Sequence, residues 1–529
     1  MSYNELNSYV NNIFSIASQL SSVWEPIAGS NREKIVVDII RSNLEEIAEA
    51  INIEPIEIGS WSEDFCYIET SEEIYPCSIH PPYYGEIDIE FKRSDIIRLQ
   101  IDNIDKIVNG STLDIIFVDM PTDPDDISTI ANILKSYNPL ALVFIDKFNA
   151  LRRIVVMDKT YCSYREAKIL EYPVLHIPKE VGERILGNEY NDKIRIVAKS
   201  DYRVGYGYNI TVDIYNGYDR TIYITAHHDH WLSGGSDNIM GIALVTTLAR
   251  MLRHSVLRKN IRAIFFTAEE GFPTKLNSFY WLVGSRTYIL NHRDEILDEL
   301  ELLLNFDVIY RDPIEISTSN IVLRNMLRRI IEKSMVIQHD NVVFDSYPFT
   351  LLGLPALTIN TFTSVLSDGI YHTSIDLVNR IDRNTILNVL KLAQRLIDIV
   401  SNEKLYVENI VYDIENELIL SIQNRYIPLE ILSELHRIIG ILSKCHHLNI
   451  NDIVRTMNMV ITKAYVNKDV MNKLGIRETI GYLHCENNAI QLPTHRILET
   501  VDDMRMCMDE YLHNLEILAY TLFKHCYTV

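Results

Sequence analysis

Long apolar runs, paired cysteines and a basic surplus are all missing from this 529-residue sequence. No stretch of about 18 uninterrupted apolar residues occurs, which argues against a transmembrane helix. Residues 1–20 lack the basic start of a signal peptide. The seven cysteines are scattered without a Cys-x-x-Cys pair, so we expect reduced thiols, with a single disulfide left open. These absences predict a cytoplasmic protein.

The charge balance is acidic, with 50 Lys and Arg against 72 Asp and Glu, a formal net charge of −22. This balance argues against nucleic acid and against anionic membranes as partners. Hydrophobic residues make up 47% and charged residues 23%, which is typical of globular proteins. A chain of this length is expected to form about three domains.

The texture of the sequence changes along the chain and predicts four segments. Residues 1–60 look helical, with a capping-box pattern from Ser30 to Glu33. Residues 61–195 carry short apolar runs between prolines, which predicts an α/β insert. Residues 196–404 alternate strand-like and helical stretches, which predicts a mainly parallel sheet covered by helices. Residues 405–529 look helical.

The last predicted helix has apolar residues in alternating steps of four and three, the spacing of a coiled-coil seam. These residues are Ile497, Val501, Met504, Met508, Tyr511, Leu515, Leu518 and Leu522. Packing within the chain is the simpler interpretation. A homodimer through these C-terminal helices is the alternative.

Acids and histidines follow several strand-like runs of the third segment. They are His227 and Asp229 after TIYITA, Glu269 and Glu270 after IRAIFFTA, Asp307 after LLLNF, and Tyr371 and His372 after PALTIN and a loop. In addition, two glycines (Gly234 and Gly235) precede Asp237, which opens a helix, and allow close backbone approach or a positive φ. Ligands in open α/β sheets bind beyond the carboxyl ends of strands, so these side chains are expected to converge.

Each of these patterns alone also has a structural interpretation. A His-x-Asp pair is often a hydrogen-bonded pair, Glu-Glu is often a solvated turn, and an Asp after a strand often caps a helix. Together they form a set of histidine and carboxylate donors without thiolate. That donor set suits zinc, manganese or cobalt.

The motifs, taken in order, resemble the M28 family of zinc exopeptidases. The matching segments are HHDHWLSGGSDNIMG, TAEEG, LNFDV, FDSYPFTLLGLPA and YHTSIDLVNRID, with Ser346 where the family commonly has His. The resemblance implies the zinc-exopeptidase fold and two Zn²⁺ ions, with Co²⁺ or Mn²⁺ as alternatives. It implies His227 and Asp307 at one metal, Glu270 and His372 at the other, and Asp237 bridging both. Glu269 would be the general base, Asp229 would orient a metal-bound histidine, and Tyr371 could hold the oxyanion.

The whole chain resembles a wider architecture as well. The resemblance implies that residues 1–60 and 196–404 together form the peptidase domain, that residues 61–195 are an insert similar to a protease-associated (PA) domain, and that residues 405–529 are a helical domain. This order of segments resembles that of glutamate carboxypeptidase II and the transferrin receptor. One departure from the family is the long stretch GFPTKLNSFYWLV, whose aromatics (Phe272, Phe279, Tyr280 and Trp281) either line a pocket or are buried. The flanking His228 and His230 have no role in the family.

The resemblance predicts a di-zinc exopeptidase that acts on peptides, with aminopeptidase action the default. A carboxypeptidase would need Arg or Lys for the terminal carboxylate. Lys92, Arg93, Arg152 and Arg153 are candidates, although solvated surface charges are the simpler expectation for them. A single-zinc glutaminyl cyclase and a non-enzymatic receptor-like dimer are the remaining alternatives.

Overall fold

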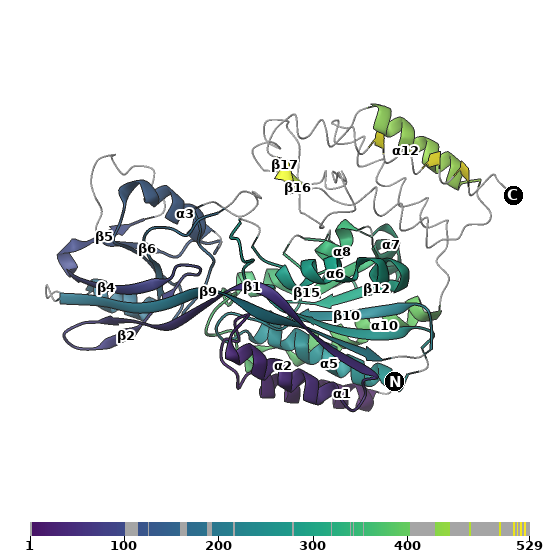
Figure 1. The fold of residues 1–529 in the computed structure, drawn as a ribbon, viewed down its shortest axis with the longest axis horizontal. Coiled ribbons are helices and arrows are strands. Elements are labelled where there is room, and N and C mark those ends of the chain that lie inside the picture. The colour runs from purple at the N-terminus through teal and green to yellow at the C-terminus, as the bar shows by residue number, and fades with distance from the viewer. Residues whose placement is uncertain are drawn as a thin grey trace.

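The computed structural model shows a mixed α/β body with an α/β insert at one end (Figure 1). It describes residues 3–100, 115–124, 126–158, 167–187, 193–214, 217–255, 257–277, 280–318, 320–338, 340–341, 343–352, 354–402 and 429–444, with a few short pieces beyond 444. No helix among these described residues is long and apolar enough to cross a membrane.

A ten-stranded mixed sheet forms the centre of the body. Its order is β14 (Val336–Gln338), β13 (Glu315–Ser317), β15 (Ala356–Asn360), β12 (Leu300–Phe306), β10 (Thr221–His227), β11 (Asn260–Phe266), β9 (Lys193–Ile214), β1 (Ala50–Glu69) and β2 (Ile74–Pro76), with β4 (Gly85–Lys92) also paired to β9. The central strands β11, β10, β12 and β15 are parallel to one another. Their carboxyl ends therefore meet at one edge of the sheet.

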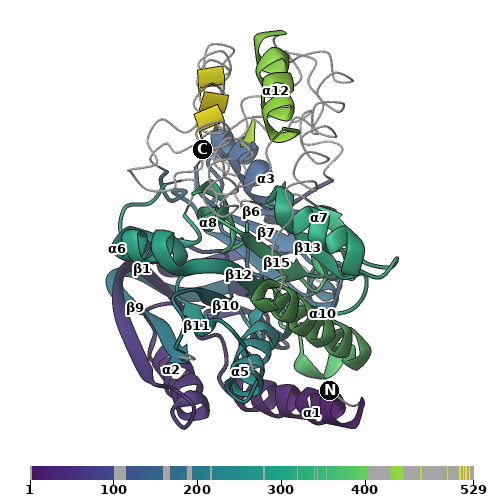
Figure 2. The same ribbon diagram turned by 90° about the vertical axis from the view of Figure 1, so that its right-hand side faces the viewer.

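Helices cover both faces of these central strands (Figure 2). One face carries α1 (Tyr3–Leu20), α2 (Asn31–Leu44), α5 (Met240–Arg253) and α10 (Arg383–Asn402). The other face carries α6 (Val283–Glu299) and α8 (Tyr347–Leu351). The strands are short apolar runs because both of their faces are buried. Two further helices lie near the sheet edge, α7 (Ile321–Ile330) and α9 (Phe362–Ser367).

The insert has its own five-stranded sheet, in the order β3 (Ser78–Ile79), β8 (Val174–Ile177), β7 (Ala141–Ile145), β6 (Ile115–Asp119) and β5 (Ile96–Leu99). Helices α3 (Asp126–Leu134) and α4 (Lys179–Gly187) accompany it. Strands β5 to β8 are parallel. The short apolar runs expected in this segment therefore include the strands β6, β7 and β8.

Two long antiparallel strands, β1 and β9, join the insert to the body (Figure 1). The expectation that residues 50–60 are helical is wrong, because β1 begins at Ala50. The boundaries expected at residues 61 and 195 fall inside these two strands. Both strands alternate buried and exposed positions, so their signal in the sequence is weaker than that of the fully buried strands.

The C-terminal segment falls mostly outside the described residues. The helix described there is α12 (Leu429–Leu442). Ile497 and Leu498 form a short strand, β17, which pairs with β16 (Tyr465–Val466), so the helix expected at 497 is wrong at its first position. The other seven positions of the heptad pattern lie outside the described residues, and the dimer seam stays a prediction.

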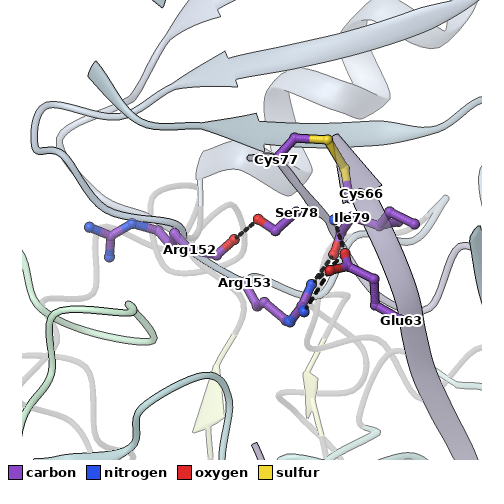
Figure 3. Close-up of a disulfide and its surroundings, with 7 residues drawn as sticks. All are labelled: Glu63, Cys66, Cys77, Ser78, Ile79, Arg152 and Arg153. Atoms are coloured by element: carbon purple, nitrogen blue, oxygen red, sulfur yellow. Dashed lines mark hydrogen bonds and ion pairs between the residues drawn. A yellow bond between two sulfur atoms is a disulfide. The ribbon is translucent and has the colours of Figure 1, made fainter. Parts of the chain in front are cut away.

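One disulfide, between Cys66 and Cys77, corrects the expectation of reduced thiols throughout (Figure 3). Cys66 lies on β1, and Cys77 follows β2, which pairs with the same strand. The scattered spacing of the cysteines concealed this pair, because an antiparallel turn between β1 and β2 brings the two residues together.

Candidate metal centre

The predicted site residues lie at the carboxyl edge of the parallel strands. His227 is the last residue of β10, Asp307 directly follows β12, and Glu269 and Glu270 follow β11 after two residues. Asp237 lies in a short helical turn, Gly235–Ile239, that leads into α5. His372 lies in the loop after α9. The sheet topology thus brings together side chains that are up to 145 positions apart in the sequence, from 227 to 372.

Two groups of ligand-type side chains share Asp237. In the first, His227 Nε2 lies 3.1 Å from Asp307 Oδ1 and 3.3 Å from Asp237 Oδ1. In the second, His372 Nε2 lies 2.7 Å from Glu270 Oε1 and 3.3 Å from Asp237 Oδ2. Each carboxylate oxygen of Asp237 therefore faces a different histidine, which is the arrangement expected of a bridging ligand.

The ligand-type side chains of the site suit divalent cations better than they suit hydrogen bonding to one another. Within the described part of the chain, neither ring nitrogen of His372 has a hydrogen-bond partner, although Glu270 Oε1 is 2.7 Å away. Four carboxylates that are nine-tenths or more buried (Asp237, Glu269, Glu270 and Asp307) crowd this small volume. Buried like charges are costly unless a cation compensates them. Histidine nitrogen and carboxylate oxygen without thiolate are donors typical of zinc.

Asp229 holds the Glu269–Glu270 turn rather than facing a metal. Its Oδ1 accepts the Glu269 N–H at 3.0 Å, and its Oδ2 accepts the Glu270 N–H at 3.2 Å. Its backbone oxygen lies 2.9 Å from His227 Nδ1, so the ring is oriented with Nε2 toward the other ligands. The backbone oxygen of Asp229 thus orients the ring of His227, whereas the carboxylate of Asp229 orients Glu269 and Glu270.

Asp376 fixes the turn that carries Asp237. Its carboxylate accepts N–H groups from Ser236 (2.9 Å) and Asp237 (3.3 Å), and the Ser236 hydroxyl (2.9 Å). Gly234 has a φ of +54°, and a side chain at Gly235 would collide with the backbone of residues 376–378. Gly234 therefore provides the positive φ and Gly235 the close backbone approach that the sequence suggested.

The side chains of the site carry a surplus of negative charge among themselves. Burial, with Glu270 and Asp307 adding to it, raises the pKa of Glu269 well above its ordinary value, despite the nearby His227. Burial also raises the pKa of Asp307 to about 6, against the opposing effect of His227. Burial alone would lower the pKa of His372, but the Glu270 and Asp237 carboxylates raise it to about 10. Bound cations would take the place of these protons.

A pocket opens beside Glu269, Glu270 and His372. Its remaining lining residues are apolar or aromatic: Ile154, Val155, Tyr280, Trp281, Val343 and Tyr371. Ile154 and Val155 come from the insert, and Tyr280 and Trp281 come from the long stretch after Glu270. Phe272 of that stretch is fully buried, and Phe279 lies outside the described residues. Of these aromatics, Tyr280 and Trp281 therefore line the pocket, and Phe272 is buried.

Tyr371 lines the pocket, and its ring stacks on that of His372 with centroids 3.7 Å apart. Ser346, where the family commonly has His, donates its hydroxyl to Asp340 Oδ1 and shares a second hydrogen bond with the Thr358 hydroxyl in the core. His228 lies 3.2 Å from the buried carboxylate of Glu33. The side chain of His230 packs against Gly234.

Three features were missed in the sequence. Glu33, beyond its predicted capping contact with Ser30, uses its carboxylate to bind Gly29, Tyr208, His228 and Thr267. Asp345 is fully buried close to the site, and burial raises its pKa to about 7. Arg152 and Arg153 are 2% exposed and ion-paired, so the expectation of surface charges is wrong for both. Long-range ion pairs leave no periodic pattern that a sequence could show.

Comparisons with known proteins agree with this geometry. Residues 209–397 match the sequence model of peptidase family M28. A zinc aminopeptidase from Bacillus subtilis aligns with a TM-score of 0.56 at 17% identity, over 75% of this chain and 95% of that one. A peptidase M28 precursor from Shewanella amazonensis aligns with a TM-score of 0.55 at 16% identity, over 76% and 97%. No curated protein sequence matches the chain.

At these identities the structural likeness establishes the fold, a mixed α/β fold of the M28 aminopeptidase kind. The sequence match is confined to residues 209–397, about a third of the chain. Residues 209–397 of this chain are a peptidase domain of family M28.

Proposed function

We propose that this protein is a di-zinc aminopeptidase, which removes residues one at a time from the free amino end of peptides. The observation that carries the proposal is the pair of ligand groups that share Asp237, next to the buried Glu269 at one pocket. His227, Asp237 and Asp307 would hold one ion. Asp237, Glu270 and His372 would hold the other, and Co²⁺ or Mn²⁺ suit the same donors.

The chemistry that two such ions supply when bound is polarisation of the scissile carbonyl and acidification of water. Glu269 takes a proton from the attacking water onto its carboxylate. It then delivers this proton to the leaving nitrogen as the C–N bond breaks, which yields a free amino acid and a shortened peptide. Asp229 accepts the Glu269 N–H and so fixes its direction. Tyr371, which lines the pocket, would hold the carbonyl oxygen.

The charge of the pocket favours an aminopeptidase over a carboxypeptidase. The described residues that line the pocket include two glutamates but no Lys or Arg. A terminal carboxylate would need a Lys or Arg there, whereas a terminal amine does not. The best cationic candidates in the insert, Arg152 and Arg153, are buried and paired with Asp146, Glu25 and Glu63.

The test is mass spectrometry of one short peptide in free, N-acetylated and C-amidated forms, each incubated with zinc-loaded protein with and without chelator. We expect trimming from the amino end that acetylation and chelation both abolish. Trimming from the carboxyl end, blocked by amidation, would contradict the proposal in favour of a carboxypeptidase. No hydrolysis, with zinc bound, would move the protein to the cyclase or receptor-like alternatives.

Location and assembly are proposed on separate grounds. The sequence predicts a cytoplasmic protein, but a disulfide is more typical of oxidising compartments. Counting free thiols in protein taken directly from cells decides between the two: seven indicates a reducing compartment and five indicates an oxidising one. A homodimer through the C-terminal helices is tested by the mass of the full chain in solution.

A further inference from the structure

One segment of the insert lies directly against the loop that carries His372. Arg152 and Thr373 form an antiparallel bridge, and Arg153 N donates to His372 O at 3.0 Å. Ser374 N donates to Leu151 O at 2.9 Å, and Leu151 N donates to the Ser374 hydroxyl at 3.0 Å. The backbone at His372 and directly after it is therefore paired with the insert, in addition to its contacts within the peptidase domain.

The Arg152 side chain adds a second layer to this contact. Its guanidinium donates to the carbonyl oxygens of Tyr371 and Gly369, the latter at 2.7 Å. Its Nε donates to Asp146 Oδ2 at 3.1 Å, and the two side chains are 3% and 0% exposed. Asp146 also lies 3.0 Å from His176 Nε2, so it is held in place from the other side. A planar guanidinium with several fixed donors can bind all three acceptors at once.

The neighbouring Arg153 anchors the same segment to the body. Its guanidinium binds both carboxylate oxygens of Glu25. It also binds both carboxylate oxygens of Glu63 on β1 (Figure 3). The Ser78 hydroxyl holds the Arg152 carbonyl at 2.9 Å (Figure 3). These contacts hold the backbone of Arg152 in place. The Arg152 side chain therefore starts from a fixed position when it binds the loop of residues 369–374.

We propose that Arg152 is a positioning residue for His372, so that the insert completes the metal site of the peptidase domain. The proposal rests on the metal site of the proposed function. His372 has a φ of +54°, a conformation that the loop must be held to maintain. Arg152 binds the carbonyl directly before this residue, and Arg153 binds the carbonyl of His372 itself. Removing the guanidinium frees one flank of the ligand.

The experiment compares Arg152→Ala and Arg152→Lys with Arg98→Ala in the full chain. Arg98 is a matched control, because it forms an exposed bidentate pair with Asp119 in the same insert. Chelator competition measures the affinity of each variant for each of the two zinc ions. Hydrogen exchange of the protein without zinc reports on the backbone of residues 369–376. Lys keeps the charge of Arg152 but cannot serve three acceptors in fixed directions.

For both Arg152 variants we expect one zinc to bind about 10- to 100-fold more weakly, the size typical of outer partners of metal ligands. Exchange in residues 369–376 should become faster, and Arg98→Ala should match wild type in both measurements. Folded Arg152 variants that bind both ions with wild-type affinity would overturn the proposal, whatever the exchange shows. If Arg152→Ala fails to fold, Arg152→Lys and Asp146→Asn decide by the same criterion.

Failure of the proposed function would look different. Wild-type chain that binds no zinc would contradict the metal site itself. Wild-type chain that binds two ions and trims peptides, together with unaffected Arg152 variants, would contradict only the role of Arg152.

Discussion

Glu269 depends on its surroundings more than any other residue of the site. It is 7% exposed, and burial raises its pKa well above that of a free glutamate. In the proposed function Glu269 would hold a proton between two steps, and its burial beside the ligand groups is consistent with that role. Its N–H is fixed by Asp229, while Glu270, one position on, faces His372. Two adjacent residues of the same type are thus given separate tasks by their contacts.

The first prediction concerns Glu269→Gln. The amide has the shape of the carboxylate but cannot take a proton from water, so we expect kcat to fall by about 10²- to 10⁴-fold. Zinc content should remain as in wild type, because Glu269 belongs to neither ligand group. Glu183→Gln, an exposed change on α4, is the control. A near-normal rate for Glu269→Gln would show that the base has been assigned wrongly.

The candidate ligands could be predicted from the sequence because His227, Glu270 and Asp307 are donor types that follow strand-like runs, and because all five stand in motifs that resemble those of the M28 family. Their partners could not. Asp376, Glu33 and Arg152 act through backbone groups far away in the sequence, and Asp and Arg in loops are usually solvated. Only the packing of the insert against the body shows that Arg152 is buried.

At the scale of elements, the fully buried strands β10, β11, β12 and β15 were predictable as short apolar runs bounded by turns. Strands β1 and β9 were not, because much of each lies in a twisted ribbon with alternating burial and reads as part of the flanking segments. Their lengths, 20 and 22 residues, are well beyond the usual strand of about five or six residues.

The disulfide gives the second prediction. Cys66→Ser combined with Cys77→Ser should lower the free energy of unfolding by roughly 2–3 kcal/mol, because the bond closes a short loop of the unfolded chain. The sequence separation of the two residues is 11. The measurement is urea unfolding without reductant, followed by fluorescence. Adding reductant should weaken wild type and leave the double variant unchanged, and equal stability of the two proteins without reductant would contradict the bond.

The pocket gives the third prediction. Its apolar lining favours an apolar side chain on the amino-terminal residue of the substrate. Val343, a half-buried lining residue, is a suitable probe. Val343→Asp should lower kcat/KM for an amino-terminal Leu by about tenfold or more relative to an amino-terminal Lys, since a buried apolar contact is replaced by a charge. Val343→Thr is the control of similar shape. An unchanged Leu-to-Lys ratio in Val343→Asp would place the substrate elsewhere.

At the scale of the whole molecule, the insert and the peptidase domain share one buried polar interface. His80 lies in the insert beside Arg152 and Arg153, with its Nδ1 within 3.0 Å of the Ile154 backbone. Burial, with the neighbouring His176 adding to it, lowers the pKa of His80 well below 6.5. Just below pH 6.5, His80 therefore stays neutral in the folded protein but binds a proton in the unfolded chain.

The fourth prediction follows from the sign of this shift. Below about pH 6.5 the unfolded chain binds a larger fraction of a proton at His80 than the folded protein does. The free energy of unfolding therefore decreases as the pH is lowered, by up to about 1.4 kcal/mol per pH unit. Above that pH the contribution of His80 is constant. Thermal and urea unfolding between pH 5 and 8 measure it. His80→Asn should flatten the slope, whereas the exposed His254→Asn should leave it as in wild type. Equal slopes in wild type and His80→Asn would contradict the prediction.

The central claim is that five side chains from separate segments of the chain, Asp237 among them, hold two ions, and the most direct test is the number of zinc ions per chain. Native mass spectrometry of the zinc-loaded protein should count two for wild type. It should count one for His227→Ala, which leaves Asp237, Glu270 and His372 intact. A wild-type chain that binds a single zinc ion, with no loss in His227→Ala, would contradict the account.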